Sequence, residues 1–467
     1  MSTAGARCSG YADDALGRDD MVGLLDRLAR REVSAGELRE AATARARAVQ
    51  PELNAVTTWI DTPADGLATE DAPFAGVPTL FKDNEALAGY LTSHGSSAVP
   101  GTPAVASSPW VVHALGLGLS PVAKTTLSEF GLTATSETRR FGATRNPWDL
   151  ARSSGGSSGG SAALVAAGVV PLAHGNDGGG SIRIPASCCG LVGLKPTRGR
   201  LPDSVSRLPV DITVQGVLSR TVRDTARYFA EAERGHRVRM LPAIGHVEGP
   251  SSARLRIGVV TVPPMGLPVS DEVAAQVSAA AALLASLGHR VVDVPHPVAD
   301  SFGPDFLRYW GLLAGLARRL GALEFGTGFD SSRVEPFTRE LAAVASEQAA
   351  LLPGTLLRLR ALARDHEAVY GSCDVVLSPV LAHEPPPIGY LGPDVAPRTH
   401  LLRVLRYVSF TPLQNVSGSP AISLPLGRSA AGVPMGVQLA APFGHERRLL
   451  ELAYELEAAA PWPSIDE

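Results

Sequence analysis

Two clusters of glycine and serine, at residues 155–161 and 178–181, are the part of this 467-residue chain best suited to chemistry. Glycine lets the backbone approach a bound group closely, although it weakens regular structure by about 0.5–1 kcal/mol per position. An apolar run separates the clusters, and the pattern S-I-R-I-P at 181–185 ends the second one. Flexible linkers rarely enclose an apolar run or precede such a fixed pattern. The stretch 153–199 therefore predicts a site built by the backbone.

A serine hydroxyl in these clusters needs a base to remove its proton before it can act as a nucleophile. The run G-G-S-S-G at 155–159 matches the G-x-S-x-G elbow of α/β-hydrolases, in which Ser157 would be the nucleophile. That arrangement also needs an acid and a histidine further along the chain. The candidate histidines are His289, His296, His366, His383, His400 and His445.

Lys82 is a different kind of base. It ends the run G-V-P-T-L-F-K at residues 76–82, which favours a buried lysine at the end of a strand. A lysine accepts a proton only in its neutral form, and its ordinary pKa is about 10.4. Burial would have to lower the pKa of Lys82 by several units before this side chain could act near neutral pH.

Phosphate and metal chemistry are not supported by the motifs. A phosphate-binding loop has the pattern G-x-x-x-x-G-K-[ST], and neither cluster precedes such a lysine. The chain has no H-E-x-x-H motif and no tight cluster of histidine and aspartate. We therefore expect no metal and no other cofactor.

The composition is that of a globular protein, with 45% hydrophobic and 19% charged residues. A formal net charge of −4 gives no sign of a nucleic-acid or basic membrane surface. No apolar run reaches the roughly 18 residues of a membrane span, and the first residues lack an apolar signal core. The four cysteines, two of them adjacent, do not form a disulfide framework. We expect a cytoplasmic protein that binds neither nucleic acid nor membrane.

The periodicity of the chain predicts an α/β fold. Helices are expected at 21–31 and from Ser34, a capping residue, to about residue 49, with Pro51 ending the second helix. A strand at 255–262, a helix that begins at Ser270 and a strand at 289–294 form a strand–helix–strand unit, which implies parallel pairing. Further strands are predicted at 76–82, 121–124, 169–172, 374–378, 421–426 and 435–440, and further helices at 162–168, 221–231, 302–325, 336–370 and 446–458.

The chain resembles the amidase signature family over roughly residues 34–456. The motifs that carry the resemblance are GVPTLFKDN, KTTLSEFG, GATRNPWD, the stretch 153–199, DVVLSP, FTPLQNVSGSPAISLPLG and GVPMGVQL. The resemblance implies an α/β fold with a mixed β-sheet sandwiched between α-helical layers. It also implies one domain over residues 1–467, with N-terminal helices at about 20–50 and a variable, largely helical substrate entrance at about 263–370.

The resemblance implies a serine–cis-serine–lysine triad. Residue by residue, the base is Lys82, the bridging serine is Ser157, which follows a cis peptide bond, and the nucleophile is Ser181. The activity it implies is hydrolysis of a carboxylic amide to carboxylate and amine or ammonia, through an acyl-enzyme on Ser181. Two alternatives stay open on the same scaffold, namely the amidase subunit of a tRNA-dependent amidotransferase and an acyl transferase.

The remaining site residues surround Ser181. The backbone N–H groups near it are expected to form an oxyanion hole. The expected residues are Gly178, Gly179 and Gly180 for the oxyanion hole, Ser158, Asp177 and Arg183 as supporting residues, and Cys373 in the substrate pocket. Asn176 stands where the family often has threonine. This detail, with His174 and the adjacent pair at 188–189, resembles the branch that contains 6-aminohexanoate cyclic dimer hydrolases.

The expected partner is a small-molecule amide, and a homodimer is a further expectation. Aromatic residues in the entrance region favour an apolar or linear acyl group, because an unpaired charge is costly to remove from water. These aromatic residues are Phe302, Phe306, Tyr309, Trp310 and Phe337. The choice between linear and cyclic amides stays open.

Overall fold

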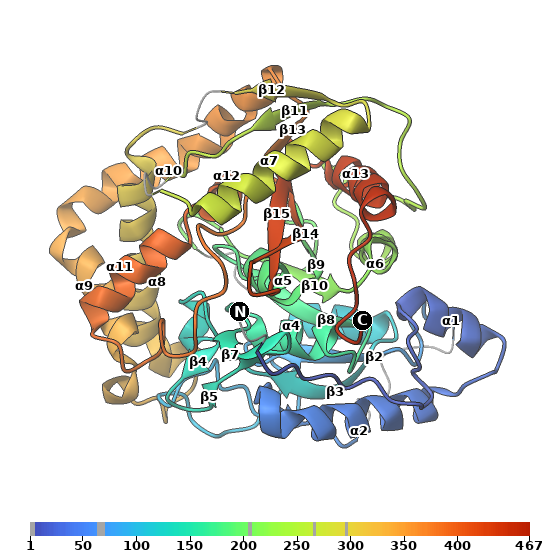
Figure 1. The fold of residues 1–467 in the computed structure, drawn as a ribbon. Coiled ribbons are helices and arrows are strands. Elements are labelled where there is room, and N and C mark those ends of the chain that lie inside the picture. Colours follow the sequence, from blue (N-terminus) through green and yellow to red (C-terminus); the bar gives the residue numbers. More distant parts are fainter. Residues whose placement is uncertain (1–4, 63–70, 204–207, 265–267, 295–297) are drawn as a thin grey trace.

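An eight-stranded mixed β-sheet runs through the middle of the molecule in a computed structural model that describes residues 5–62, 71–203, 208–264, 268–294 and 298–467 (Figure 1). Its strand order is β12-β11-β13-β15-β14-β9-β10-β8. The strands are β8 (Leu172–Asp177), β9 (Val192–Lys195), β10 (Val214–Ser219), β11 (Arg256–Val259), β12 (Arg290–Asp293), β13 (Val375–Pro379), β14 (Ala421–Arg428) and β15 (Pro434–Ala440). β11 pairs in parallel with both β12 and β13, and the other pairs are antiparallel.

A smaller three-stranded sheet lies beside the β8 edge. Its order is β1-β3-β2, with β1 (Val56–Trp59), β2 (Pro78–Lys82) and β3 (Ser120–Thr125). β2 packs against β8, which brings the end of one sheet to the edge of the other. Two short ribbons complete the strands, namely β4 (Glu137–Thr138) with β5 (Gly142–Ala143) and β6 (Arg145–Asn146) with β7 (Asp149–Ser153).

Helices cover both faces of the large sheet. Successive residues of a strand face opposite sides, so Val217 and Leu218 of β10 enter two different cores. Val217 packs in the core that contains residues of α6 (Val222–Gly235), α7 (Asp271–Ser286) and α13 (Glu446–Ala459). Leu218 packs in the core formed around α4 (Gly159–Ala166) and α5 (Arg183–Cys189). These layers confirm the expected mixed sheet between helices.

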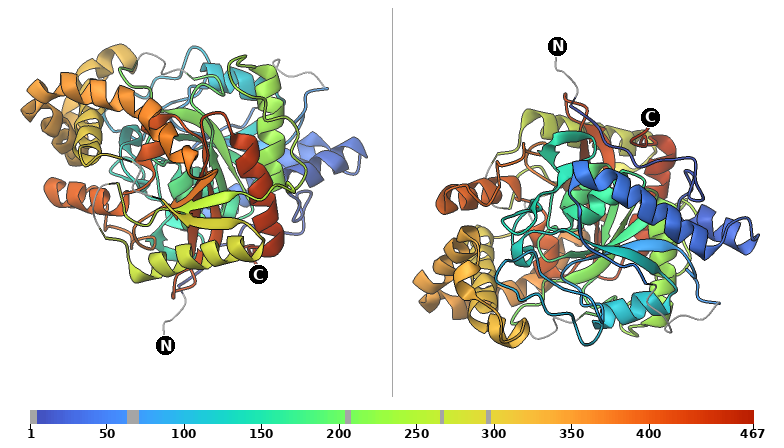
Figure 2. Two further views of the ribbon diagram at one scale, coloured as in Figure 1. Left: turned by 90° about the horizontal axis from the view of Figure 1, so that it is seen from above. Right: turned by 90° about the horizontal axis from the view of Figure 1, so that it is seen from below.

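The chain has further helices besides these. They are α1 (Met21–Ala29), α2 (Ala35–Leu53), α3 (Pro109–Gly116), α8 (Phe302–Glu324), α9 (Pro336–Glu347), α10 (Leu352–His366), α11 (Pro397–Tyr407) and α12 (Pro412–Ser417). α8, α9, α10 and α11 gather on the side of the molecule away from α1 (Figure 2). Among the described residues, no helix has the length and apolar character needed to cross a membrane.

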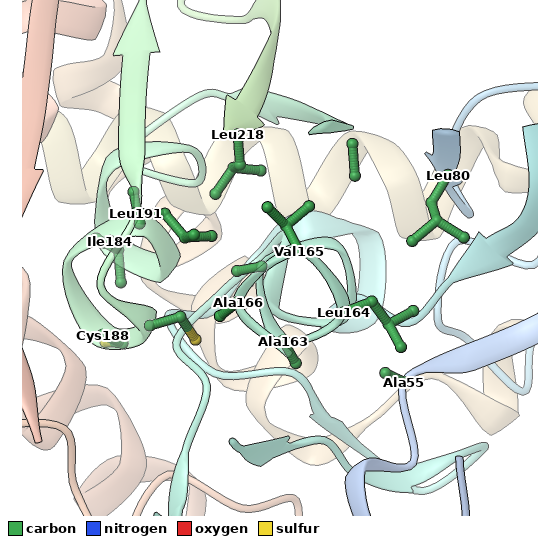
Figure 3. Packing of buried hydrophobic residues seen from close by; sticks show 14 of the residues in the cluster. Ala55, Leu80, Ala163, Leu164, Val165, Ala166, Ile184, Cys188, Leu191 and Leu218 are labelled. Atoms are coloured by element: carbon green, nitrogen blue, oxygen red, sulfur yellow. The ribbon is translucent and has the colours of Figure 1, made fainter. Parts of the chain in front are cut away.

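α4 is the structural centre of the site region. All eight of its residues are buried, and Leu164 and Val165 pack among Leu80, Leu218 and other apolar side chains (Figure 3). A helix enclosed on every side needs small residues, and the sequence supplies glycine, alanine and serine. This packing holds the chain that enters α4, including the first Gly/Ser cluster, in a fixed position.

Three predicted elements differ from the structure. The strand predicted at 169–172 begins only at Leu172 and runs to Asp177, because buried polar side chains in β8 conceal its apolar pattern. α2 continues through Pro51 to Leu53 and ends where Asn54 adopts a left-handed conformation with φ of 49°. The helix predicted at 336–370 is divided into α9 and α10, since a proline at the start of α10 begins a new helix.

Candidate active site

The three residues predicted to form the triad come from three different elements. Lys82 is the last residue of β2, Ser157 lies just before α4, and Ser181 lies between β8 and α5. Lys82 is fully buried and Ser157 is 1% exposed, whereas Ser181 borders a cavity that opens to solvent. The packing of β2 against β8 and the burial of α4 bring these elements together.

Lys82 lies against two polar partners. Its Nζ atom is 2.7 Å from the hydroxyl oxygen of Ser157 and 2.5 Å from Oδ1 of Asn176. Burial lowers the pKa of Lys82 to about 7, although Asp177 and Glu85 act in the opposite direction. A substantial fraction of Lys82 is therefore neutral near neutral pH, which is the form that accepts a proton.

Ser157 is held by the tight packing of Gly156 before it and by hydrogen bonds of Ser136. The peptide bond between Gly156 and Ser157 is cis, as the resemblance implies. A Cβ atom at position 156 would lie 2.7 Å from the backbone nitrogen of Thr135, so only glycine fits there. Ser136 donates its hydroxyl to the carbonyl of Ser157 and accepts from the N–H of Gly159, at 3.2 and 3.0 Å. Sequence reasoning missed Ser136, which carries no motif signal of its own.

A buried ion pair shapes the loop that carries Ser181. Arg183 Nη2 lies 2.8 Å from Asp177 Oδ1, and both side chains are fully buried. Burial would raise the pKa of Asp177, but the Arg183 guanidinium outweighs this effect and holds that pKa well below its usual range. The Asp177 carboxylate also accepts the backbone N–H groups of Gly180 and Ile182, at 2.8 and 3.1 Å.

The three glycines before Ser181 are not equivalent. Gly178 and Gly179 line the cavity together with Ser181. Gly180 does not line it, and its N–H is directed to Asp177. The expectation that Gly180 donates to an oxyanion is therefore wrong for this arrangement, because its donor is already used to fold the loop. Gly178, Gly179 and Ser181 are the residues of this loop that line the cavity.

Residues near the C-terminus secure the same loop, and sequence reasoning did not assign them. Asn415 of α12 donates Nδ2 to the carbonyl and the carboxylate of Asp177, both at 2.8 Å. Thr411 donates its hydroxyl to the carbonyl of Gly179 at 2.6 Å. Gln438 of β15 accepts from Arg183 at 2.7 Å. These residues lie in the FTPLQNVSGSP and GVPMGVQL motifs, so the motifs were a signal for them.

Ser158, expected as a supporting residue, makes one long hydrogen bond near the site. Its hydroxyl lies 3.4 Å from the carbonyl of Asn176, and it is fully buried. Among the described residues no hydrogen bond joins the hydroxyls of Ser157 and Ser181. The structure thus brings Lys82 and Ser157 into direct contact and leaves the Ser181 hydroxyl at the cavity wall.

The cavity above Ser181 is lined mainly by apolar side chains. Of the aromatic residues expected in a substrate channel, Phe306 and Trp310 line it. Phe337 packs behind Trp310, with ring centroids 5.8 Å apart, and Phe302 stacks on Phe306 at 6.1 Å. Tyr309 donates its hydroxyl to the carbonyl of Val210 and does not line the cavity.

Cys373 is not part of this cavity. Its side chain is fully buried in a separate apolar cluster with Val260, Val376 and Ala440, where burial raises the pKa of the thiol. The expectation that Cys373 contacts substrate is therefore wrong. Cys373 lies two residues before β13, which pairs with β11. Its sulfur atom lies close to Gly258 of β11.

The described residues do not form the α/β-hydrolase arrangement in which a histidine activates Ser157. Among the described candidate histidines none hydrogen-bonds this serine; His296 lies outside the described residues. His289 contacts Glu455 at 3.0 Å, for example, and His400 lies 3.4 Å from the hydroxyl of Thr133. Lys82, by contrast, lies 2.7 Å from the hydroxyl oxygen of Ser157. Nor do the described histidine, cysteine, aspartate and glutamate side chains form a group of three that could hold a metal ion.

A family model described as Amidase matches residues 37–450 of the chain. The chain belongs to the amidase family. AmiC of Mycobacterium tuberculosis, whose name assigns it provisionally to the amidases, is 49% identical to this amidase over 467 residues, which cover 98% of both chains. A 6-aminohexanoate-cyclic-dimer hydrolase of Pseudomonas sp. is 39% identical, with 92% of both chains covered.

A solved structure of 6-aminohexanoate cyclic dimer hydrolase complexed with substrate has the same fold. It superposes with a TM-score of 0.85 at 34% identity, covering 97% of this amidase and 98% of that chain. These similarities confirm the family and the branch that the motifs predicted. The protein is an enzyme that hydrolyses the C–N bond of amides.

Proposed function

We propose that this amidase hydrolyses a carboxylic amide through an acyl-enzyme on Ser181, with Lys82 as the base and Ser157 as the relay between them. The observation that carries the proposal is the contact between the fully buried Lys82 and Ser157, at 2.7 Å. A neutral amine in this position can accept a proton from Ser157 while Ser157 accepts one from Ser181. The Ser181 oxygen then attacks the amide carbonyl.

The tetrahedral intermediate places a negative charge on the former carbonyl oxygen. The backbone N–H groups of Gly178, Gly179 and Ser181 are the donors proposed to stabilise this charge. Each donor of this kind contributes about 10²–10³-fold to the rate. Protonation of the leaving nitrogen by the Ser157–Lys82 pair breaks the C–N bond, and a water molecule activated by the same pair then releases the carboxylate.

The protein is proposed to act in the cytoplasm on a small-molecule amide without a partner subunit. All four cysteines are free, which suits a reducing compartment. Its similarity to cyclic dimer hydrolases over most of both chains favours a self-contained amidase over an amidotransferase subunit. The cyclic dimer of 6-aminohexanoate is accordingly the first substrate to test.

An amide panel tests this function directly. Linear amides, anilides and the cyclic dimer of 6-aminohexanoate are incubated with the purified protein, and the released amine and carboxylate are measured. We expect equal amounts of amine and carboxylate from at least one amide, without added metal or partner protein. Turnover that requires an added zinc ion or an added subunit would contradict the proposed function.

Replacing Asn176 by aspartate is expected to move the acidic limb of the pH profile of kcat/KM to higher pH. The Asn176 oxygen is 2.5 Å from Lys82 Nζ, and a carboxylate there would favour the ammonium form. An opposite charge at this range raises a pKa by about 1–3 units. Because only the neutral amine accepts a proton, the variant needs a higher pH to reach the same rate.

The neutral substitution Asn176→Thr is the matched control, since it removes the amide without adding a charge. We expect its acidic limb to stay where the wild-type limb lies. An Asn176→Asp profile that coincides with the wild-type profile would show that Lys82 is not the group whose titration limits the reaction.

A further inference from the structure

Two helices, α8 and α11, contribute apolar side chains to the lining of the cavity above Ser181. Phe306, Trp310 and Leu313 of α8 line it, and their spacing of four and three residues puts them on one helical face. Val404 and Leu405 of α11 also line it. The other apolar lining side chains are Phe130, Leu132, Ala134, Ile184, Ile212, Val408 and Pro412.

No lining residue carries an ionisable side chain. Arg308 and Arg403, charged residues on these two helices, have partners outside the cavity lining. Arg308 of α8 binds Asp305 at 2.9 Å, and Arg403 of α11 donates to the carbonyl of Tyr390 at 2.7 Å. Asp211, beside the lining residue Ile212, accepts the N–H of Thr213 at 3.3 Å and is not itself a lining residue.

Two threonine hydroxyls are the polar side chains of the lining besides Ser181. Thr133 lies 3.4 Å from Nε2 of His400, and Thr213 borders the cavity beside Gly178. A neutral hydroxyl can satisfy an ester or amide group by one hydrogen bond. It cannot compensate for the water that a carboxylate or an ammonium group loses on entering an apolar cavity.

We propose that this cavity binds an uncharged, apolar acyl group and excludes acyl groups that end in a carboxylate or an ammonium. The proposal rests on the proposed function, because it concerns the acyl half of the amide that Ser181 attacks. The occupant is thus a neutral amide whose acyl chain is aliphatic or aromatic, with at most a neutral polar group near Thr133 or Thr213.

Four primary amides with the same six-carbon acyl chain test the proposal. They are hexanamide, 6-aminohexanamide, the monoamide of adipic acid, and the methyl ester of that monoamide. We expect hexanamide and the methyl ester to have kcat/KM values within about tenfold of each other. Both charged amides should fall below them by at least about 100-fold, since the charge has no partner in the cavity. Equal kcat/KM values for charged and uncharged amides would overturn the proposal.

The acyl length gives a second readout. From butanamide to hexanamide, kcat/KM should rise by up to about fourfold for each added methylene that is buried. A flat series would show that the acyl chain does not enter the apolar cavity.

A charge placed in the wall should reverse the preference. Leu313→Arg puts a guanidinium in the lining of the cavity, and we expect the ratio of kcat/KM for the adipic monoamide over hexanamide to rise at least tenfold. The matched control is Leu320→Arg, two turns further along α8 at a position that is 47% exposed and outside the cavity. Leu405→Arg, on α11, provides a second variant if Leu313→Arg does not fold. An unchanged ratio in a folded variant contradicts the proposal.

Binding to Ser181→Ala separates this proposal from the proposed function. Calorimetry with this variant measures affinity for hexanamide and for the adipic monoamide without any turnover. Tighter binding of hexanamide supports the uncharged cavity even if the wild-type protein hydrolyses none of the four amides. Equal binding of both amides contradicts it even if hydrolysis through Ser181 is established.

Discussion

The Ser181→Ala variant is expected to lose amide hydrolysis, with kcat reduced by roughly 10⁵–10⁶-fold, as for loss of the nucleophile in other serine hydrolases. Ser157 hydrogen-bonds Lys82, and it is not expected to replace Ser181 as the nucleophile. The hydroxyl of Ser181 lies at the cavity wall, so its removal should leave the melting temperature within a few degrees of wild type. The rate is measured with the best amide of the panel.

Ser187→Ala is the matched control for this variant. Ser187 is a buried serine on α5, six residues further on, and its hydroxyl accepts the N–H of Gly436 at 2.7 Å. We expect its kcat to stay within about tenfold of wild type, although its melting temperature should fall because Gly436 loses an acceptor. Retention of activity in Ser181→Ala, together with loss in Ser157→Ala, would instead identify Ser157 as the nucleophile.

Substitution of Lys82 is expected to have the second largest effect. Lys82→Met keeps the length of the side chain and removes the base, which should lower kcat by about 10²–10⁴-fold or more. Lys82→Arg should not restore activity, because a guanidinium does not give up its proton in a protein. In the wild-type protein kcat/KM should rise with pH through about 7, the value to which burial lowers the pKa of Lys82. The sign follows from the neutral amine being the active form.

Lys195 offers an unusually close control. It is also fully buried, burial likewise lowers its pKa to about 7, and it donates to the carbonyl of Pro196 rather than to a serine. If Lys82 is the base, a folded Lys195→Met variant keeps the acidic limb of the wild-type profile. If the acidic limb is lost in Lys195→Met and kept in Lys82→Met, the group that titrates is Lys195. That result would contradict the proposed mechanism.

Local patterns predicted most of the strands and helices, whereas Lys82, Ser157 and Ser181 were assigned from the resemblance to the amidase signature family. The strand–helix–strand unit of β11, α7 and β12 follows from apolar periodicity and a capping serine, both of which act within a few residues. The strand predicted at 169–172 differs from β8, which runs from Leu172 to Asp177. His174, Asn176 and Asp177 are polar but buried, so the sequence of β8 does not resemble that of a core strand. Their burial depends on partners that lie elsewhere in the chain.

Contacts distant in sequence account for what was missed at the site. Asn415 reaches Arg183 across 232 residues, and no local pattern shows that one side chain satisfies the other. The same limitation explains Gly180, whose N–H is directed to Asp177 by the fold of the loop. Cys373 adjoins the DVVLSP motif in the sequence, but its side chain packs in a separate apolar cluster beside β11, so closeness to a motif along the chain does not imply closeness to the cavity.

The central claim, that Ser181 is the nucleophile activated through Lys82, is tested most directly by locating the adduct of a fluorophosphonate probe. Trypsin cleaves after Arg152 and Arg183, so Ser157 and Ser181 fall in one peptide and fragment ions must distinguish them. We predict a single adduct on Ser181 that forms in the wild-type protein and is strongly reduced in Lys82→Met. An adduct on Ser157, or one on Ser181 that forms equally fast without Lys82, would contradict the account.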